Sequence, residues 1–249
     1  FDTDEEAAAY QVAINNSSNV YHRVYNMQNN LGRLMAGDVM FEDRDGSGSI
    51  GTGAGTVDDP GDMMIIGNTT PRYSYSFRIE ASWNGFDISA FFQGVGKRDW
   101  YPTANKDDIY GANQFWQLYG YTIPSFITYD FMDDVWSEQN PGGYFPRLRP
   151  IQSYNGGPLG QNNDRYLQSV AYLRFKNLTI GYTLPVLKKY LSKLRIYVSG
   201  ENLCYWSPLK KHCKLIDPEL AISSGTYKGG TGTGYTMPRT FSFGVDITF

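Results

Sequence analysis

A short run of oxygen-bearing side chains in the first quarter of the chain has the spacing of a cation-binding loop. Asp43, Asp45 and Ser47 occupy every second position, Gly48 follows them, and Ile50 comes two residues later. A hard cation such as Ca²⁺ needs several oxygen ligands at one point, a glycine at the sharp turn and an apolar anchor beside it. The pattern therefore predicts the first half of a calcium-binding loop.

The second half of this loop departs from the usual calcium pattern. The position normally taken by a bidentate glutamate is Ala54, and it lies in a run of Gly, Thr and Ala. Asp58, Asp59 and Asp62 are each candidates to close the site from further along the chain. The alternative is a turn rich in Gly and Asp that binds no metal.

A second group of candidate binding residues is aromatic and lies in the long segment 95–168. This segment shows no sustained alternation and is rich in Tyr, Trp, Asn, Gly and Pro, and connections of this length usually carry function. Exposed aromatic rings stack on sugars or bury themselves in a partner, whereas buried rings pack the loop on itself. The residues selected as candidate ligand or partner contacts are Trp100, Tyr101, Trp116, Tyr119 and Trp136.

The sequence offers little support for catalysis. Asp133 and Asp134 are adjacent, so they do not face each other across a bond as the paired carboxylates of a glycosidase must. Cys204 and Cys213 form either a disulfide in an oxidising compartment or two free thiols. Two histidines and no CxxC pair argue against a zinc site. We therefore expect no enzyme, and no cofactor other than calcium.

The composition limits the classes of protein to consider. The chain has 249 residues and a formal net charge of -3, so its charge gives no reason to expect nucleic-acid binding. Charged residues are 19% and aromatic residues 16%. An apolar run of 18 or more residues is absent, which excludes a transmembrane helix. The mean hydropathy of -0.43 is compatible with a membrane barrel, because barrel strands alternate apolar and polar residues.

Alternation of apolar and polar residues predicts five strands, of which the last is the clearest. From Phe241 to Phe249 every odd position is apolar and every even position is polar or Gly. Asn84 and Gly85 predict a tight hairpin between the first two strands. A break of phase near Lys176 predicts either a bulge or a strand end that stands above a membrane. The predicted strands lie near 72–82, 86–94, 170–184, 194–202 and 239–249.

The connections between these strands are sorted by length. Short turns alternate with long loops, which in an up-and-down meander places every long loop on one side, as in outer-membrane barrels. Five strands cannot close a barrel, which needs at least about eight. We therefore expect an open all-β antiparallel fragment, preceded by a partly helical segment, 1–36, in which Thr3 and Glu6 have capping-box spacing. A soluble β-rich carbohydrate-binding module is the alternative.

Several blocks of sequence, in order along the chain, carry a family resemblance. They are GDVMFEDRDG (37–46) with IIGN (65–68), GFDIS (85–89), FQG (92–94), YLRFKNLTIGY (172–182), YVSGENL (197–203), DPE (217–219) and PRTFSFG (238–244). Together they resemble the SusC/RagA-type TonB-dependent outer-membrane transporters. The resemblance implies that residues 37–249 are the C-terminal strands of a transmembrane up-and-down barrel of about 22 strands with long extracellular loops.

The resemblance also implies a function and partners. Transporters of this type import glycans or other oligomers such as peptides across the outer membrane, together with a SusD-like surface lipoprotein. The TonB complex would act through a plug and a TonB-contacting segment upstream of this chain. Phe249 resembles the C-terminal aromatic signal for barrel assembly, and the odd residues from Phe241 onward would face lipid. Asp62 matches the family's distal Asp despite an insertion before it, and Ser47 stands where the family often has Asp.

Overall fold

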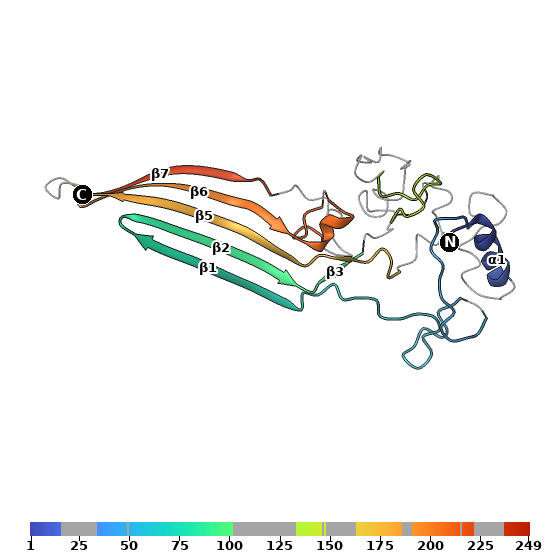
Figure 1. Ribbon diagram of the computed structural model, residues 1–249. Helices are drawn as coiled ribbons and strands as arrows, with labels where there is room; N and C mark the ends of the chain where they lie inside the picture. Colours follow the sequence, from blue (N-terminus) through green and yellow to red (C-terminus); the bar gives the residue numbers. More distant parts are fainter. Residues whose placement is uncertain are drawn as a thin grey trace, which may run out of the picture.

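The computed structural model describes residues 1–15, 34–48, 50–101, 133–145, 147, 163–185, 191–214, 216–221 and 237–249. Within these residues the fold is an antiparallel β-sheet with little helix (Figure 1). The helices are α1 (Asp4–Asn15) and the 3-10 turn η4 (Pro208–Lys211). The strands are β1 (Tyr73–Trp83), β2 (Phe86–Gly96), β3 (Asp99–Trp100), β4 (Gln168–Ser169), β5 (Tyr172–Leu184), β6 (Lys193–Trp206) and β7 (Thr240–Thr248).

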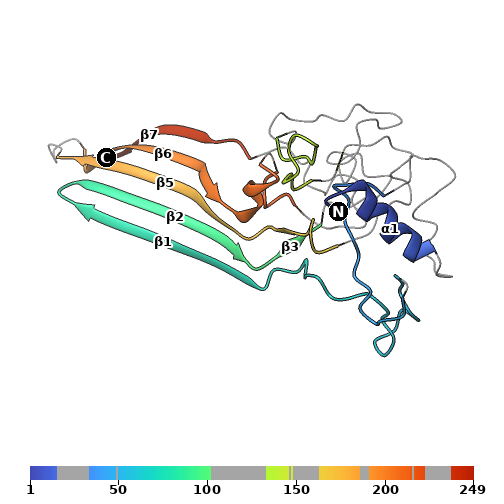
Figure 2. The ribbon, with the colours of Figure 1, turned by 45° about the vertical axis from the view of Figure 1, so that its right-hand side comes forward.

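The five long strands form one open sheet in the order β1-β2-β5-β6-β7. Every neighbouring pair is antiparallel, so the chain runs up and down without a crossover. The tight turn between β1 and β2 lies at one end of the sheet with the C-terminus, whereas α1 and the described loop segments lie at the other end (Figures 1 and 2). The loop sorting expected from the sequence is therefore present.

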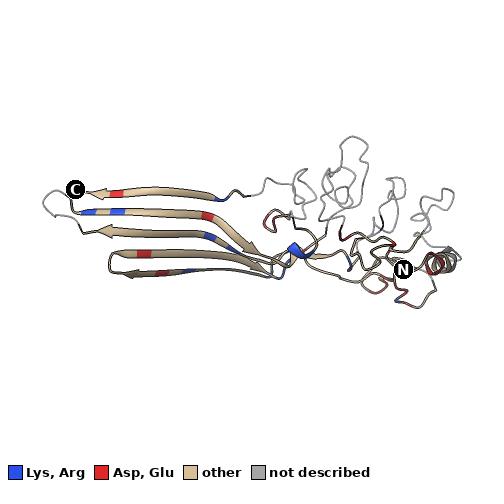
Figure 3. Ribbon diagram, turned by 45° about the horizontal axis from the view of Figure 1, so that its top comes forward, with Lys and Arg blue, Asp and Glu red and all other residues tan. Residues whose placement is uncertain are grey.

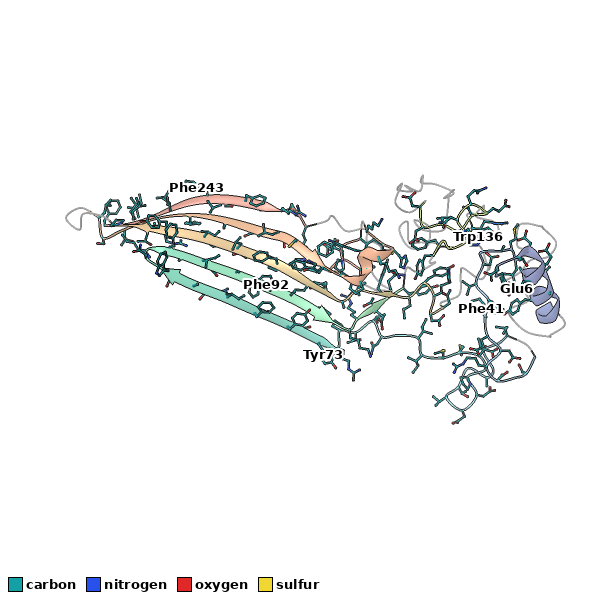
Figure 4. The ribbon with its side chains drawn as sticks, viewed as in Figure 1. Glu6, Phe41, Tyr73, Phe92, Trp136 and Phe243 are labelled. Carbon is teal, nitrogen blue, oxygen red and sulfur yellow. The ribbon has the colours of Figure 1, made fainter. Side chains whose placement is uncertain are left out.

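One face of this sheet is apolar from edge to edge, and it is exposed. A single row across the five strands pairs Ala81 with Ile88, Ile88 with Ile180, Ile180 with Val198, and Val198 with Phe243. Val198 is 52% exposed and Phe243 is 71% exposed. The labelled side chain of Phe243 stands clear of the ribbon in Figure 4. A water-soluble sheet would instead cover such a face with a second layer.

A bulge keeps the apolar face continuous along β5. Phe92 pairs with Phe175 and Phe91 with Asn177, so Lys176 is one residue extra on β5. Without that residue, the two sequence phases on either side would fall on opposite faces. The ring of Phe92 stacks between Phe77 and Phe175, with centroids 4.8 Å and 4.5 Å away. Of the two readings of the phase break, the structure shows the bulge.

The opposite face of the sheet is polar and carries an ion-pair network. Arg195 on β6 lies 2.6 Å from Asp87 on β2 and 3.0 Å from Asp246 on β7. It reaches Asp87 across Gly181 of β5, where a Cβ atom would come within 2.5 Å of the guanidinium. The glycine thus provides the space for an ion pair between two strands that are not neighbours. Figure 3 shows that charged residues are otherwise sparse along the strands.

The loop end has a conventional core, unlike the exposed face of the sheet. Residues from four separate segments contribute to it, and Trp100 and Tyr166 are each only 1% exposed. The short pair β3 and β4, which the sequence pattern did not indicate, holds two of these segments together. None of the helices in the described part of the chain is long and apolar enough to cross a membrane. The core residues are Trp100, Tyr101, Val135, Phe145, Tyr166, Val170, Leu209, Cys213, Ile216 and Ala221.

A buried ionic contact joins this loop core to the sheet. Arg174 of β5 lies 2.5 Å from Asp217 and 2.7 Å from Glu219, and the Arg174 side chain is only 2% exposed. Lys176, the bulge residue, adds a contact of 3.0 Å to Glu219. The guanidinium also lies over the ring of Tyr205 at 4.8 Å. The Asp-Pro-Glu segment is therefore held against the sheet by two cations from β5.

The structure also shows local features of the predicted helix, strand and cysteines that the sequence left open. At the start of α1 the Glu6 N–H donates to Thr3 Oγ1 at 3.1 Å, which is half of a capping box. Strand β6 continues to Trp206 rather than ending near 202, because a left-handed residue, Asn202, lets it pass the β5 bulge. Cys204 and Cys213 are both free thiols.

We predict that Arg174→Met will loosen the loop region. The change leaves the Asp217 carboxylate buried without its main cation, which typically costs about 3–5 kcal/mol. Native-state proteolysis of the full-length protein, followed at the connection 207–239, measures the free energy of this local opening. Arg78→Met is the matched control, because Arg78 pairs at 3.5 Å with an exposed carboxylate and its loss should cost about 1 kcal/mol or less. Equal effects of the two changes would contradict the prediction.

Candidate functional site

Three carboxylates predicted from the sequence as cation ligands lie together in the structure. One ligand oxygen each from Asp43, Asp45 and Asp62 falls within a cluster whose members are at most 4.8 Å apart. Asp43 and Asp45 are exposed and Asp62 is half-buried. The first two come from one short loop, whereas the third arrives from a point well beyond it in the sequence.

The backbone of the loop folds around these carboxylates. The Ser47 N–H donates to Asp45 Oδ1 at 2.8 Å, and the Gly48 N–H donates to Asp43 Oδ2 at 2.7 Å. Gly48 has a φ of 77°, a left-handed conformation that glycine adopts without strain. Ile50 is 6% exposed and packs with Ala7 of α1 and with Leu34. The apolar anchor expected from the sequence therefore fixes the loop to the N-terminal segment, where the Phe41 side chain also lies close to α1 (Figure 4).

Asp62 joins the cluster because the intervening residues leave the loop and return to it. The Asp62 N–H donates to the Gly51 carbonyl at 2.9 Å, which closes the excursion 52–61 at its base. The Asp62 carboxylate in turn accepts from the Arg44 N–H at 2.7 Å and from the Gly51 N–H at 2.5 Å. The insertion before Asp62 thus does not displace this residue from the position of a distal ligand.

Hydrogen bonds within the excursion engage the carboxylate of Asp59, one of the candidates to close the cation site. The Asp59 carboxylate accepts from the Ala54 N–H at 2.9 Å, and the Asp59 N–H donates to Thr56 Oγ1 at 3.1 Å. Gly53 leaves no room for a Cβ, because that atom would overlap the Asp59 carboxylate. Of the three aspartates considered for closing the site, Asp59 holds the excursion together and Asp62 lies at the cluster.

The electrostatics of the cluster favour a cation. Hydrogen bonds from the side chain and backbone of Ser47 hold the pKa of Asp45 below its ordinary value, so this carboxylate stays ionised. Three carboxylates so close together repel one another unless a positive charge lies between them. Carboxylate oxygens are among the ligands that Ca²⁺ prefers, and the ligand role of Ser47 stays a prediction. The arrangement fits the predicted calcium loop, and the occupancy by calcium stays a prediction.

Three of the five aromatic candidates for ligand contact are buried. Trp100 and Tyr101 are buried in the loop core, with exposures of 1% and 7%. Trp136 is 8% exposed and is covered on one face by the Arg147 guanidinium at 4.5 Å. These three rings pack the loop region on itself, which was the alternative to binding. Trp116 and Tyr119 lie outside the described residues, and their contact roles stay predictions.

The loop core contains a polar junction that sequence reasoning missed. His212 Nδ1 lies 2.5 Å from Asp134 Oδ2, and the imidazole stacks on the Tyr144 ring with centroids 3.5 Å apart. Next to it, burial raises the pKa of the Cys213 thiol to about 12, so the thiol is neutral and a poor nucleophile at neutral pH. The contact partners are 78 residues apart in the sequence, and their spacing carries no local signal.

Comparison with known proteins finds a curated relative over most of the chain. The chain is 29% identical over 223 residues to TonB-dependent receptor P3 of Formosa agariphila, a match that covers 86% of this chain and 19% of that protein. The resemblance to TonB-dependent receptors expected from the sequence blocks is therefore confirmed by a curated relative. The chain spans about a fifth of the length of that relative. No known protein-family profile matches the chain.

Solved structures with a similar arrangement include two states of the RagAB peptide importer. The open-open state matches 73% of this chain and 17% of its own chain at 19% identity, with a TM-score of 0.47. The closed-closed state matches 73% of this chain and 18% of its own at 20% identity, with a TM-score of 0.44.

We predict that Asp62→Asn in the full-length protein will weaken calcium binding by about tenfold or more. The change removes one of three negative charges while keeping the shape of the side chain, and ligand charge sets calcium affinity in such loops. Isothermal calorimetry with Ca²⁺ measures the effect. Asp58→Asn is the matched control, since Asp58 lies in the excursion outside the carboxylate cluster. Undiminished calcium affinity in Asp62→Asn would remove Asp62 from the site.

Proposed function

We propose that this chain is the C-terminal barrel portion of an outer-membrane TonB-dependent importer of oligomeric nutrients. The observation that carries the proposal is that apolar side chains are buried at one end of the molecule and exposed at the other. The loop end buries them in a core, whereas the sheet turns an entire face of them outward. A lipid bilayer is the environment in which such a face is stable.

The dimensions of the strands support a membrane-spanning role. A tilted barrel strand needs about 9–11 residues to cross the hydrocarbon core. The shortest of the five strands, β7, has 9 residues and the longest, β6, has 14. The exposed apolar face extends across all five, and it includes Phe241 and Phe243 at 71% each. Lipid is therefore the proposed partner of this face.

The polar face suits a water-filled lumen. Arg195 binds two carboxylates there, and Asp246 remains about half exposed in the pair. Charged groups of this kind are costly against lipid and tolerated in a hydrated barrel interior. The open edges of β1 and β7 would continue into further strands of a complete barrel, because an unpaired edge at membrane depth leaves backbone groups unsatisfied.

The substrate and partner follow from the class of protein. One similar structure is described as a peptide importer, and we propose glycans or peptides as the class of cargo here. A SusD-like surface lipoprotein would cover the loop end, and the TonB complex would supply energy from the other side of the membrane. In this assignment calcium shapes a loop and the chain performs no catalysis.

A soluble carbohydrate-binding module remains the competing function. A soluble module would need a second layer of structure to cover the apolar face. It would also need exposed aromatic rings in the loops to bind sugars. Trp100, Tyr101 and Trp136 are buried, and among the described residues the sheet contributes exposed rings such as Phe243. These observations favour the membrane protein over the module.

Fractionation combined with uptake tests the proposed function. The full-length protein should be recovered with the outer membrane as a heat-modifiable barrel. Cells that carry it should lose growth on the cognate oligomer when TonB is inactivated. Recovery in the soluble periplasm, or uptake that is independent of TonB, would overturn the proposal.

We predict that Val198→Lys will impair the barrel, whereas the neighbouring Ser199→Lys will be tolerated. The two residues adjoin on β6 but point to opposite faces, and Val198 pairs with Ile180 and Phe243 on the apolar face. A lysine in mid-bilayer costs about 2–4 kcal/mol, whereas a lumen-facing lysine remains hydrated. Unfolding of the full-length protein in lipid vesicles measures the difference. The reverse order of stability would assign the faces the other way round.

A further inference from the structure

We propose that the segment 216–221 is a shelf on the lumen wall that narrows the mouth of the barrel and limits the bulk of the solutes that enter it. This inference rests on the proposed function, because it needs the polar face of the sheet to line the lumen. It assigns to one connection a role in selecting cargo by size, which the class of protein alone does not specify.

Register places the attachment point of the shelf on the polar face. Arg174 of β5 pairs with Gln93 of β2 on one side and with Tyr205 of β6 on the other. The next residue, Phe175, points to the opposite face, where its ring stacks on Phe92. Because side chains alternate along a strand, the Arg174 side chain projects from the polar face.

Three side chains of β5 hold the shelf against this face. Arg174 lies 2.5 Å from Asp217 and 2.7 Å from Glu219. Lys176 lies 3.0 Å from Glu219, and the Tyr172 hydroxyl interacts with the same carboxylate. These contacts run from 172 to 176 and so cover about 10 Å of strand. A connection that rose straight above the barrel would not follow the wall over such a distance.

The shelf is a compact turn with both of its ends buried. The Asp217 carboxylate accepts from the Glu219 N–H at 3.0 Å. The Asp217 carbonyl accepts from the Leu220 N–H at 2.9 Å and from the Ala221 N–H at 3.1 Å. Ile216 and Ala221 lie in the loop core, with exposures of 6% and 0%. The shelf is therefore fixed to the loop core at its ends and to the sheet between them.

The returning limb of the same connection also meets the polar side of the wall. Met237 Sδ lies 3.6 Å from Lys176 Nζ, the group that also contacts Glu219. The Asn202 side chain of β6 donates to the Pro238 carbonyl at 3.3 Å. Lys176 therefore joins the shelf to the limb that leads into β7.

The ion pairs fix the distance between the shelf and the wall. A buried ion pair adds little net stability compared with apolar packing, because both charges lose their hydration. Its geometry is nevertheless strict, since the guanidinium of Arg174 is planar and its donors have fixed directions. Packed layers of backbone lie about 10 Å apart. The shelf thus takes about that much width from the lumen beside β5 and β6.

Cysteine labelling of the full-length protein in whole cells tests this inference. Ser199 lies on the polar face of β6, where it pairs with Thr179 and Ser242, and it is further from the loops than the shelf. A reagent from outside the cell must therefore pass the shelf to reach this position. In the Ser199→Cys protein, a small maleimide should react readily, whereas a maleimide with a long polyethylene glycol chain should react slowly.

Release of the shelf should admit the bulky reagent. Arg174→Met in this background should raise the ratio of the bulky to the small labelling rate about tenfold or more, because the unpaired buried carboxylates favour the open state. The milder double change Lys176→Gln with Glu219→Gln should raise the ratio in the same direction, and it keeps the test available where Arg174→Met does not assemble.

Two controls accompany these variants. Arg78→Gln removes an exposed cation from the polar face of β1 without touching the shelf, and it should leave the ratio unchanged. Matched proteins without the Ser199→Cys change give the background labelling of Cys204 and Cys213, which are free thiols.

Proteolysis at the connection 207–239 reports separately whether the shelf has been released. Faster proteolysis with an unchanged labelling ratio would overturn the inference, because the released shelf would then not have obstructed the lumen. Unchanged proteolysis and an unchanged ratio would overturn it as well, since the ion pairs would then not hold the shelf. Equal rates for the two reagents in the Ser199→Cys protein itself would also contradict it.

The proposed function and this inference fail in different ways. Recovery of the parent protein outside the outer membrane would contradict both. Recovery in the outer membrane with TonB-dependent uptake, together with a labelling ratio that does not respond to Arg174→Met, would contradict the shelf alone.

Discussion

The outward-facing apolar surface of the sheet is the constraint on which the rest of the structure depends. Because the side chains of this face do not pack on a second layer among the described residues, the sheet gains its internal order from the backbone ladder and cross-strand pairs. The stacked rings of Phe77, Phe92 and Phe175 are one such set. The polar face is then free to hold charged residues such as Arg195, provided that space is left for them, as Gly181 leaves it.

The loop region must consequently supply its own stability. Its four segments are distant in sequence, and they bury Trp100, Phe145 and Tyr166 in a core of the ordinary aqueous kind. This core needs a fixed attachment to the sheet, which the contact of Arg174 with Asp217 and Glu219 provides. The same β5 bulge that keeps the apolar face continuous also presents Lys176 to Glu219. One irregularity in a strand thus serves both regions.

Sequence alone was sufficient wherever the signal was local. Alternation located the long strands, Asn84 and Gly85 located the hairpin, and the spacing of Asp43, Asp45 and Ser47 located the carboxylate loop. Contacts between distant segments carried no such signal. The contact of His212 with Asp134 and the burial of Trp136 under Arg147 depend on how loops meet in space. Asp62 combines a local and a non-local signal. Its position before Ile65 made it a candidate ligand from the sequence, but its proximity to Asp43 and Asp45 depends on how the excursion folds.

The excursion 52–61 can change in length without changing the positions of the carboxylates in the loop. Its base is closed by the backbone contact of Asp62 with Gly51, and its interior is held by Asp59. The entropy of closing such a loop grows only slowly with its length. The outer residues, such as Val57 at 97% exposure, can therefore change in sequence and number while the carboxylates keep their places. The excursion is accordingly a natural point of surface variation, and a suitable place to insert a peptide tag or a fluorophore.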